Sequence, residues 1–366
     1  MRPPLRHEMV DRRHTVDACD DTGLGGDPCD RSSFWRKEAL VAIQEQEFGV
    51  VGLGRMGGGI ALQAARKGMK VVGHDVHGVP DDLRELGVIA TEHMGDFRSL
   101  ARPRAVFLYV PAGSLVDHVL DGLVEHLEPG DIVADGGNSY WGDSVRRSER
   151  LAERDIRLVD IGTSGGVDGA REGACFMVGG DDDAVARVEP ILRALAVEGG
   201  YVHAGPSGAG HFVKLVHNGI EFGMLQAIAE GVDLLAHHRD PLPVADVLHC
   251  WRHGSVIRSW LVDLMEREYR ERGGLESVPA YVEDTGEVNW LVSDAMAQER
   301  PIPVISQAVM QLFASRDETQ HWARAVAMMR HGFGGHPFGP DATIRKERTE
   351  GRVGPILRPR DDEQPE

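Results

Sequence analysis

"VVGLGRMGGGIALQAARKG", residues 50–68, is the stretch that decides the fold of this chain. An apolar run ends in Gly52-x-Gly54-x-x-Gly57, and a helical pattern follows at once. The first glycine permits a tight turn, the second lets a pyrophosphate approach the backbone, and the third lets helix and strand pack closely. The stretch therefore predicts a strand, a turn and a helix whose N-terminus binds a dinucleotide.

Further apolar runs alternate with helical patterns as far as residue 206. They are KVVGHD, AVFLYV, DIVADGG, IRLVDIG and ACFMVGG, and each has the length and boundaries of a strand. Such alternation predicts a mostly parallel, doubly wound sheet. From residue 207 the strand-like runs almost vanish and long amphipathic helices take over. We expect an α/β Rossmann nucleotide-binding domain over residues 47–206, followed by an all-α C-terminal domain over residues 207–338.

The two ends of the chain lack this patterning, so we expect a disordered leader (1–46) and a disordered tail (339–366). The whole chain has 366 residues and a formal charge of −18, which argues against nucleic acid or a membrane as the main partner. It contains no run of 18 apolar residues and no signal-peptide pattern, and its four cysteines have no disulfide or metal-ligand spacing. We expect a cytoplasmic protein.

The second predicted strand ends in Asp75, 21 residues beyond Gly54. A carboxylate at this position accepts hydrogen bonds from the adenosine ribose and repels a 2′-phosphate, and no arginine follows at residues 76–78. We therefore expect NAD, rather than NADP, as the cofactor. The candidate cofactor-binding residues are Gly52, Leu53, Gly54, Arg55, Met56, Gly57, Asp75, Val110 and Asn138.

An apolar helix is predicted from residue 210, yet it carries several polar side chains. Lys214, Asn218 and Glu221 are spaced i, i+4 and i+7, so they share one helical face, with His217 beside them. Lysine is scarce in this chain, at five residues, so a lysine among apolar neighbours is unusual. The face is either a solvated ladder of polar side chains or one wall of an active site.

Two polar motifs at strand ends favour the active site. Asn138 follows one predicted strand, and Ser164, Gly165 and Gly166 follow the next. Ligands of open α/β sheets bind outside the carboxyl ends of the strands, where a hydroxyl and backbone amides can hold a carboxylate. Each motif alone could be a turn. Together with the glycine fingerprint they predict one cleft, with the helix of Lys214 as its far wall.

The ordered series GLGRMG, DGGNS, SGGxxGAR and GxGHxVKxVHNGIE resembles the 6-phosphogluconate dehydrogenases over residues 47–338. Related 3-hydroxyisobutyrate-type dehydrogenases share the lysine and the asparagine of the last motif but lack its His-Asn-Gly-Ile-Glu run. The chain length and Asp75 make the sequence similar to the short bacterial form of the family, which tends to use NAD.

This resemblance implies oxidative decarboxylation of 6-phosphogluconate to ribulose 5-phosphate and CO2 with reduction of NAD, in the pentose phosphate pathway. Lys214 would be the general base on the 3-hydroxyl, which requires burial to lower its pKa from about 10.4. Glu221 would protonate C1, and no metal is implied, because the lysine ammonium does the polarising. His217 and Asn218 would hold hydroxyls. The residues that would orient the carboxylate and hydroxyls are Asn138, Ser164, Gly165 and Gly166.

The C-terminal half matches the family less completely. Arg330 and His336 keep the family's spacing and would reach into the neighbouring subunit's site, which implies a homodimer or homotetramer. The positions that help to bind the substrate phosphate in the family are here occupied by Phe222, Asn289 and Leu312. Arg316 and Arg258 are the candidates to bind the phosphate in their place.

Three alternatives stay open. A non-decarboxylating 3-hydroxyacid dehydrogenase would leave Glu221 and His217 without a task. A decarboxylating dehydrogenase of a related aldonate would explain the altered phosphate positions. A catalytically silent NAD-binding regulator would keep the nucleotide domain but not the cleft.

Overall fold

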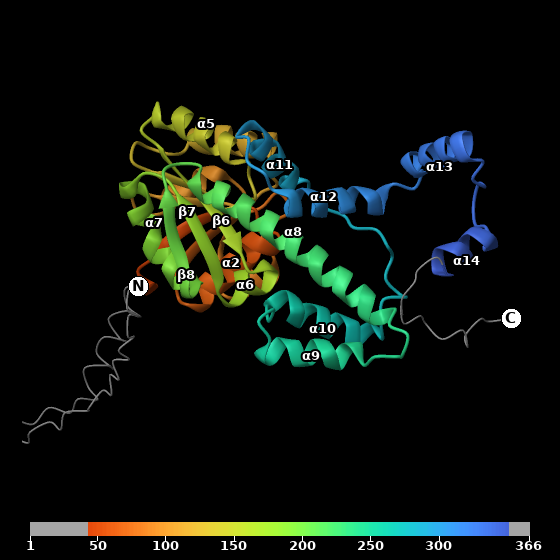
Figure 1. Ribbon diagram of the computed structural model, residues 1–366. Helices are drawn as coiled ribbons and strands as arrows, with labels where there is room; N and C mark the ends of the chain where they lie inside the picture. Colours follow the sequence, from red (N-terminus) through yellow and green to blue (C-terminus); the bar gives the residue numbers. More distant parts are fainter. Residues whose placement is uncertain (1–42, 351–366) are drawn as a thin grey trace, which may run out of the picture.

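The computed structural model describes residues 43–350, and eight strands form one sheet in the order β3-β2-β1-β4-β5-β6-β7-β8 (Figure 1). All neighbouring strands pair in parallel except β6 and β7, which are antiparallel. The predicted mostly parallel, doubly wound sheet is therefore confirmed. The strands are β1 (Glu47–Val51), β2 (Lys70–His74), β3 (Ile89–Ala90), β4 (Ala105–Leu108), β5 (Ile132–Asp135), β6 (Arg157–Ser164), β7 (Ala174–Gly179) and β8 (Ala196–Gly205).

Helices cover both faces of this sheet (Figure 1). One core contains Phe48 and Phe107 together with apolar side chains of α2 and α7, and a second core contains Val51, Leu108 and apolar side chains of α4. Burial on both faces explains why the strands are continuous apolar runs. The helices are α2 (Arg55–Arg66), α3 (Asp81–Glu85), the 3₁₀ helix η1 (Met94–Ser99), α4 (Ser114–Val124), α5 (Trp141–Ala152), α6 (Gly166–Glu172) and α7 (Asp182–Leu195).

The turn between β1 and α2 requires its glycines for steric reasons. Gly52 has a φ of +90°, and a Cβ there would lie 2.5 Å from the carbonyl oxygen of Tyr109. A Cβ on Gly57 would lie 2.0 Å from the carbonyl oxygen of Gly52. Since real Cβ contacts are never so short, only glycine lets α2 begin directly above the strand.

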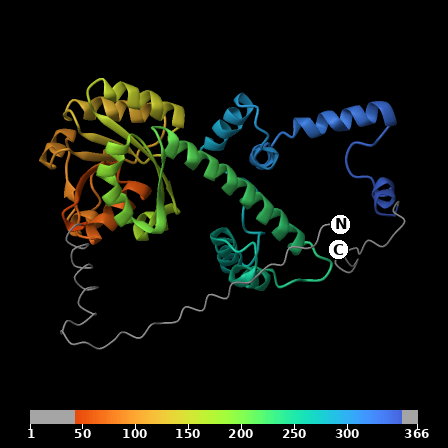
Figure 2. The ribbon, with the colours of Figure 1, turned by 60° about the vertical axis from the view of Figure 1, so that its left-hand side comes forward.

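The change from sheet to helices occurs between β8 and α8, as expected from the loss of strand-like runs. The long helix α8 leaves the sheet and runs to the hairpin of α9 and α10 (Figure 2). A small core of Val232, Val244, Leu248 and Val262 joins these three helices. The helices are α8 (Ala209–Ala236), α9 (Val244–Gly254), α10 (Trp260–Arg272), α11 (Glu287–Ala297), α12 (Pro303–Arg316), α13 (His321–Gly334) and α14 (Ala342–Glu350).

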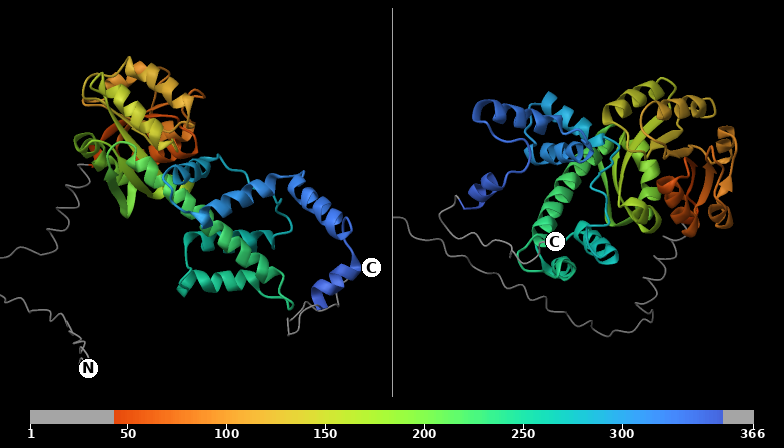
Figure 3. Two further views of the ribbon diagram at one scale, coloured as in Figure 1. Left: turned by 45° about the horizontal axis from the view of Figure 1, so that its top comes forward. Right: turned by 90° about the vertical axis from the view of Figure 1, so that its right-hand side faces the viewer.

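The last two helices project away from the sheet and from α8 (Figures 1 and 3). No described side chain of α13 is buried. Its exposed apolar side chains are Trp322, Val326, Met328 and Met329. A helix with this much uncovered apolar surface lacks a packing partner within the described part of the chain.

Helix α14 lies within the predicted tail, so the expectation of disorder is wrong for residues 342–350. Asp341 caps this helix, because its side-chain Oδ1 accepts a hydrogen bond from the backbone N–H of Ile344 at 3.0 Å. The charged residues that suggested disorder are also good helix formers. The remainder of the predicted tail, 351–366, and residues 1–42 of the predicted leader lie outside the described residues. Over residues 43–350, no helix combines the length and the apolar character needed to cross a membrane.

Candidate active site

The N-terminus of α8 lies directly against the sheet because side chains are absent at the contact. A Cβ on Gly162 of β6 would lie 2.5 Å from the Cβ of Lys214, and a Cβ on Gly210 would lie 2.5 Å from the carbonyl oxygen of Asp160. The fully buried carboxylate of Asp160 accepts hydrogen bonds from the backbone N–H groups of Gly208 at 2.6 Å and His211 at 2.8 Å. A negative charge at a helix N-terminus is favourable, so Asp160 helps to hold Lys214 over β6.

The polar face of α8 meets the end of β6, as the sequence predicts. His217 Nε2 and Ser164 Oγ lie 3.0 Å apart, in hydrogen-bond contact. On its other side, the His217 ring has Nδ1 3.5 Å from Lys214 Nζ, 3.3 Å from Asn218 Oδ1 and 3.8 Å from Glu221 Oε2. The histidine therefore links the strand-end serine with the three other polar side chains of the helix.

The electrostatic environment lowers the pKa of Lys214 from its ordinary value. Burial is the largest cause, and the charges of Glu221, Cys175 and Glu287 oppose it. The pKa of His217 is also lowered, first by burial and then by the neighbouring lysine. A neutral lysine is the form that a general base needs, so this environment suits proton abstraction.

The glycine turn fits the pyrophosphate of a dinucleotide. A Cβ built on Gly54 would meet nothing within 4 Å, so open space lies where the pyrophosphate approaches. Gly54 is also the N-cap of α2 and offers no side-chain cap, which leaves the first N–H groups of the helix for an anion. Val110 borders the same turn, since its Cγ1 would lie 3.1 Å from a Cβ on Gly52.

The carboxylate of Asp75 is held against this turn. Its Oδ2 accepts a hydrogen bond from the backbone N–H of Leu53 at 2.7 Å, and its Oδ1 accepts one from the N–H of His77 at 2.8 Å. Each carboxylate oxygen can accept a further hydrogen bond, so the side chain is fixed in place and still available to a ribose.

The remaining strand-end residues also lie at this edge of the sheet. Asn138 is half-buried in the loop after β5, and its side-chain amide has no hydrogen-bond partner among the described residues. Gly165 and Gly166 have φ values of +116° and +61°, and they lead from the end of β6 into α6. Glycine is favoured at such angles.

Arg330 and His336 are not brought to this chain's own site. Arg330 is an exposed residue of α13, and His336 follows that helix, on the part of the molecule that projects from the body (Figure 3). Leu312 is buried on α12 and contributes packing.

The two candidate substitutes for the phosphate-binding residues differ. Arg316 forms ion pairs with Glu283 at 3.3 Å and Asp284 at 3.1 Å, so its charge is already neutralised. Arg258 is exposed just before α10, and no ion pair joins it to another described residue. Its neighbour Trp260 borders the glycine loop, since the indole Cη2 would lie 3.7 Å from a Cβ on Gly166.

Sequence reasoning missed one thiol at the site. Cys175 is the β7 residue paired with Ser164 of β6, and it is exposed. The only signal that could have located it is the antiparallel register of β6 and β7, which the sequence does not reveal.

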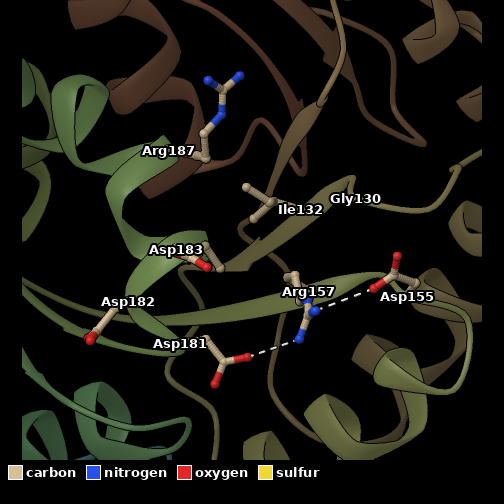
Figure 4. Close-up of a pocket in the computed structure, with 9 residues that line it drawn as sticks. Gly130, Ile132, Asp155, Arg157, Asp181, Asp182, Asp183 and Arg187 are labelled. Atoms are coloured by element: carbon tan, nitrogen blue, oxygen red, sulfur yellow. Dashed lines mark hydrogen bonds and ion pairs between the residues drawn. The ribbon is translucent and has the colours of Figure 1, made fainter.

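A hollow of about 640 Å³ lies at the opposite edge of the sheet (Figure 4). It is lined by the first residues of β5 and β6 and by the start of α7. Arg157 pairs there with Asp155 at 3.3 Å and with Asp181 at 3.2 Å. The lining carries more acidic than basic side chains, and the hollow is separate from the edge that carries Lys214.

The glycine turn, the strand-end loops and the polar face of α8 define a dehydrogenase-like protein with a nicotinamide-dinucleotide-binding domain and a helical second domain. Residues 47–205 match the family model described as the NAD binding domain of 6-phosphogluconate dehydrogenase. Residues 210–345 match the model of the 6-phosphogluconate dehydrogenase C-terminal domain. The chain belongs to the 6-phosphogluconate dehydrogenase family.

Individual relatives agree with this assignment. The chain is 41% identical to the Bacillus subtilis protein YqeC, which carries a provisional 6-phosphogluconate dehydrogenase name, over 79% of this chain and 98% of that protein. It is 39% identical to the NAD(+)-dependent, decarboxylating 6-phosphogluconate dehydrogenase of Haloferax volcanii, over 79% of this chain and 97% of that protein. A solved 6-phosphogluconate dehydrogenase of Plasmodium falciparum, described with its cofactor NADP+ and with its substrate 6-phosphogluconate, matches at a TM-score of 0.67 and 25% identity, over 83% of this chain and 68% of that one.

Proposed function

We propose that this chain oxidises and decarboxylates 6-phosphogluconate to ribulose 5-phosphate and CO2, with NAD as the electron acceptor. The observation that carries the proposal is the polar face of α8, where His217 contacts both Lys214 and the strand-end Ser164, and Glu221 lies one turn further on. The names of the Haloferax and Plasmodium relatives support the substrate and the decarboxylation.

Lys214 acts as the base in the oxidation. NAD, when bound, would supply the hydride acceptor. Burial lowers the pKa of Lys214, and in its neutral form this lysine takes the proton of the 3-hydroxyl. The resulting ammonium then donates to the oxygen at C3 and stabilises the negative charge that develops there when CO2 leaves.

Glu221 completes the product by protonating the carbon that lost CO2, which is C2 of the substrate and becomes C1 of ribulose 5-phosphate. The acid and the base lie on the same face of α8, two turns apart, so each can reach a different carbon of one substrate. His217 and Ser164 orient the substrate between them, while the free amide of Asn138 and the backbone of Gly165 and Gly166 hold its hydroxyls and carboxylate.

NAD, rather than NADP, is the proposed cofactor because of Asp75. Its carboxylate is fixed beside Leu53 of the turn, where it would repel a 2′-phosphate. The Haloferax relative is named as NAD(+)-dependent, whereas the Plasmodium relative is described with NADP+. Cofactor choice therefore varies among these relatives.

A second copy of the chain completes the proposed substrate site. The uncovered apolar surface of α13 needs a partner, and Arg330 lies on that same helix. We assign the substrate phosphate to Arg258 of one chain together with Arg330 and His336 of the other, in a homodimer or a larger even assembly. Arg316 is not favoured, since Glu283 and Asp284 neutralise it.

Stoichiometry tests the proposed function. Purified protein is incubated with 6-phosphogluconate and NAD, and NADH formation and CO2 release are followed together. Equal amounts of both support the proposal. NADH without CO2 would indicate a non-decarboxylating dehydrogenase, and neither product, with NAD binding retained, would indicate a regulator. Activity with unphosphorylated gluconate that matches activity with 6-phosphogluconate would point to a related aldonate.

A further inference from the structure

A carboxylate of the helical domain joins two aromatic side chains of the nucleotide domain. Asp294 of α11 accepts a hydrogen bond from the Tyr140 hydroxyl at 2.9 Å with one oxygen, and from the Trp141 indole N–H at 2.7 Å with the other. The rings pack in edge-on contacts, with centroid distances of 5.7 Å from Tyr140 to Trp290 and 5.9 Å from Trp141 to Phe212. We call Tyr140, Trp141 and Asp294 the clasp.

The Asp294 carboxylate interacts with these two donors and forms no ion pair with another described residue. The pKa of Tyr140 is raised, first by burial and then by its bond to Asp294, so the phenol remains a donor. A carboxylate accepts hydrogen bonds more strongly than a neutral group, so both aromatic side chains are held firmly.

The clasp lies directly beside a candidate binding residue. Tyr140 and Trp141 follow Asn138 and Ser139, and the other end of this loop is held by the fully buried Asp135. Asp135 accepts hydrogen bonds from the Gly137 N–H at 3.0 Å and from the Ser139 hydroxyl at 2.8 Å. Among the described residues of this loop, Asn138 is thus the one whose polar side chain makes no hydrogen bond. The carboxylates of Asp135 and Asp294 hold the residues on either side of it.

Helix α11 also packs against α8 close to the reacting groups, since Leu291 Cδ2 would lie 2.3 Å from a Cβ on Gly219. The clasp therefore connects the Asn138 loop to a helix that borders the catalytic lysine. Because the two partners lie in different domains, the clasp is one of the contacts that join these domains.

We propose that Asp294 is a positioning residue, which holds the loop of Asn138 against α11 so that the Asn138 amide meets cofactor and substrate in one orientation. The inference rests on the proposed function. Asp294 touches neither ligand and acts only through Asn138 and its neighbours. Preorganised groups are effective because their orientation costs nothing when the substrate binds.

Two substitutions of Asp294 test this role. Asp294→Leu removes both acceptors at similar size, and we expect kcat to fall about tenfold, or ~1.4 kcal/mol in the barrier. Asp294→Asn should be milder, because its amide can accept from Trp141 and donate to the Tyr140 oxygen. The control is Ser293→Ala, since among the described residues that exposed hydroxyl bonds only to the Asn289 carbonyl of its own helix. Equal kcat for Asp294→Leu and the control would overturn the proposal.

A double-mutant cycle with Asn138→Ala separates positioning from a merely structural contribution. If Asp294 acts through Asn138, Asp294→Leu should cost little further activity once the Asn138 amide is gone. A fully additive loss would contradict the proposal. Should Asp294→Leu fail to fold, Tyr140→Phe and Trp141→Phe each remove one donor, and the same cycle is run with them.

The affinity for NAD+ keeps this test distinct from that of the proposed function. Failure of the wild-type protein to oxidise 6-phosphogluconate would count against the proposed function alone. The clasp is then judged from NAD+ titrations, in which Asp294→Leu must raise the dissociation constant in the wild-type background and not in the Asn138→Ala background. An unchanged dissociation constant in both backgrounds would reject the clasp.

Discussion

The two domains differ in how much of their apolar surface each buries within its own fold. The nucleotide domain covers both faces of its sheet and buries two extensive cores. The described helical domain has one small core around Leu248, and it leaves Trp322 66% and Met328 66% exposed. The first domain therefore contains what its fold requires, whereas the second presents an apolar surface that is consistent with the proposed assembly of two chains.

The largest expected effect lies at the junction of the two domains. Lys214→Ala should reduce oxidation of 6-phosphogluconate by about 10²–10⁴-fold, because a general base contributes that much. Stopped-flow measurement of NADH formation checks this. Lys70→Ala is the control, since that lysine pairs with Glu47 at the surface. Oxidation by Lys214→Ala near the wild-type rate would mean that the polar face of α8 is only a solvated ladder.

Disrupting the apolar surface of α13 should impair assembly and substrate turnover but leave NAD binding intact. Trp322→Glu combined with Met329→Glu should dissociate the assembly and lower kcat/KM by about 10²-fold, since two charge-assisted hydrogen bonds to substrate are worth roughly 3 kcal/mol. Binding of NAD should be unchanged, because the nucleotide domain is complete in itself. Sedimentation, kinetics and NAD titration measure the three quantities.

A matched control for α13 is available on the sheet. Ile89→Glu places the same charge at an apolar residue of β3 that is 47% exposed. It should leave both assembly and activity intact. A monomeric wild-type protein with full activity would show that the helical domain needs no partner.

Cofactor choice is expected to depend on the nucleotide domain alone. Asp75→Ser should shift the NAD/NADP preference toward NADP by about tenfold, equivalent to ~1.4 kcal/mol, because the repulsion of a 2′-phosphate is removed. Kinetics with each cofactor measure the ratio. His77→Ala serves as control, since only the backbone of that residue bonds to Asp75. Equal use of both cofactors by the wild-type protein would refute the role of Asp75.

The smallest effect concerns pH and stability. Burial lowers the pKa of Lys214 below the ordinary 10.5, so kcat/KM should rise with pH along a limb that lies below 10.5. The same shift destabilises the folded chain at neutral pH, where unfolding lets the lysine bind its proton more tightly. This penalty disappears as the pH rises from the folded pKa to 10.5.

Lys214→Met tests the sign of this effect. It should raise Tm at pH 7 by about 2–4 °C for each kcal/mol of penalty removed, and the gain should shrink toward pH 10.5. Thermal melts at the two pH values measure it. A Tm that falls at pH 7, or a gain that grows with pH, would contradict the assigned direction.

The sequence predicts the features that depend on local steric rules. The turn of Gly52, Gly54 and Gly57 and the six apolar strands follow from residue spacing alone, as does the shared face of Lys214 and Glu221. Strands β3 and β8 were not predicted, because β3 has only two residues and "AVEGGYVHAG" contains polar residues and glycines that weaken a strand pattern.

The features that sequence does not predict depend on contacts between distant residues. Trp141 and Asp294 are 153 positions apart, and no local pattern indicates that they meet. The buried carboxylate of Asp160 reads as an ordinary strand residue, yet it caps a helix 48 positions later. The prediction of disorder was wrong at α14 for a different reason, since the same charged composition suits both a solvated helix and a disordered tail.

Helix α8 has a mechanical consequence, because it spans 28 residues without a break and is fastened to the sheet only near its beginning. At 1.5 Å per residue it is about 42 Å long, and Lys214 lies about 8 Å from its first residue. If the helix tilted as a rigid rod by about 10°, its far end would sweep about 7 Å while Lys214 moved only about 1 Å. Lys214, the proposed base, thus sits near the fulcrum of a lever whose long arm carries α9 and α10, whereas Glu221, about 18 Å from the first residue, would move about 3 Å in the same tilt.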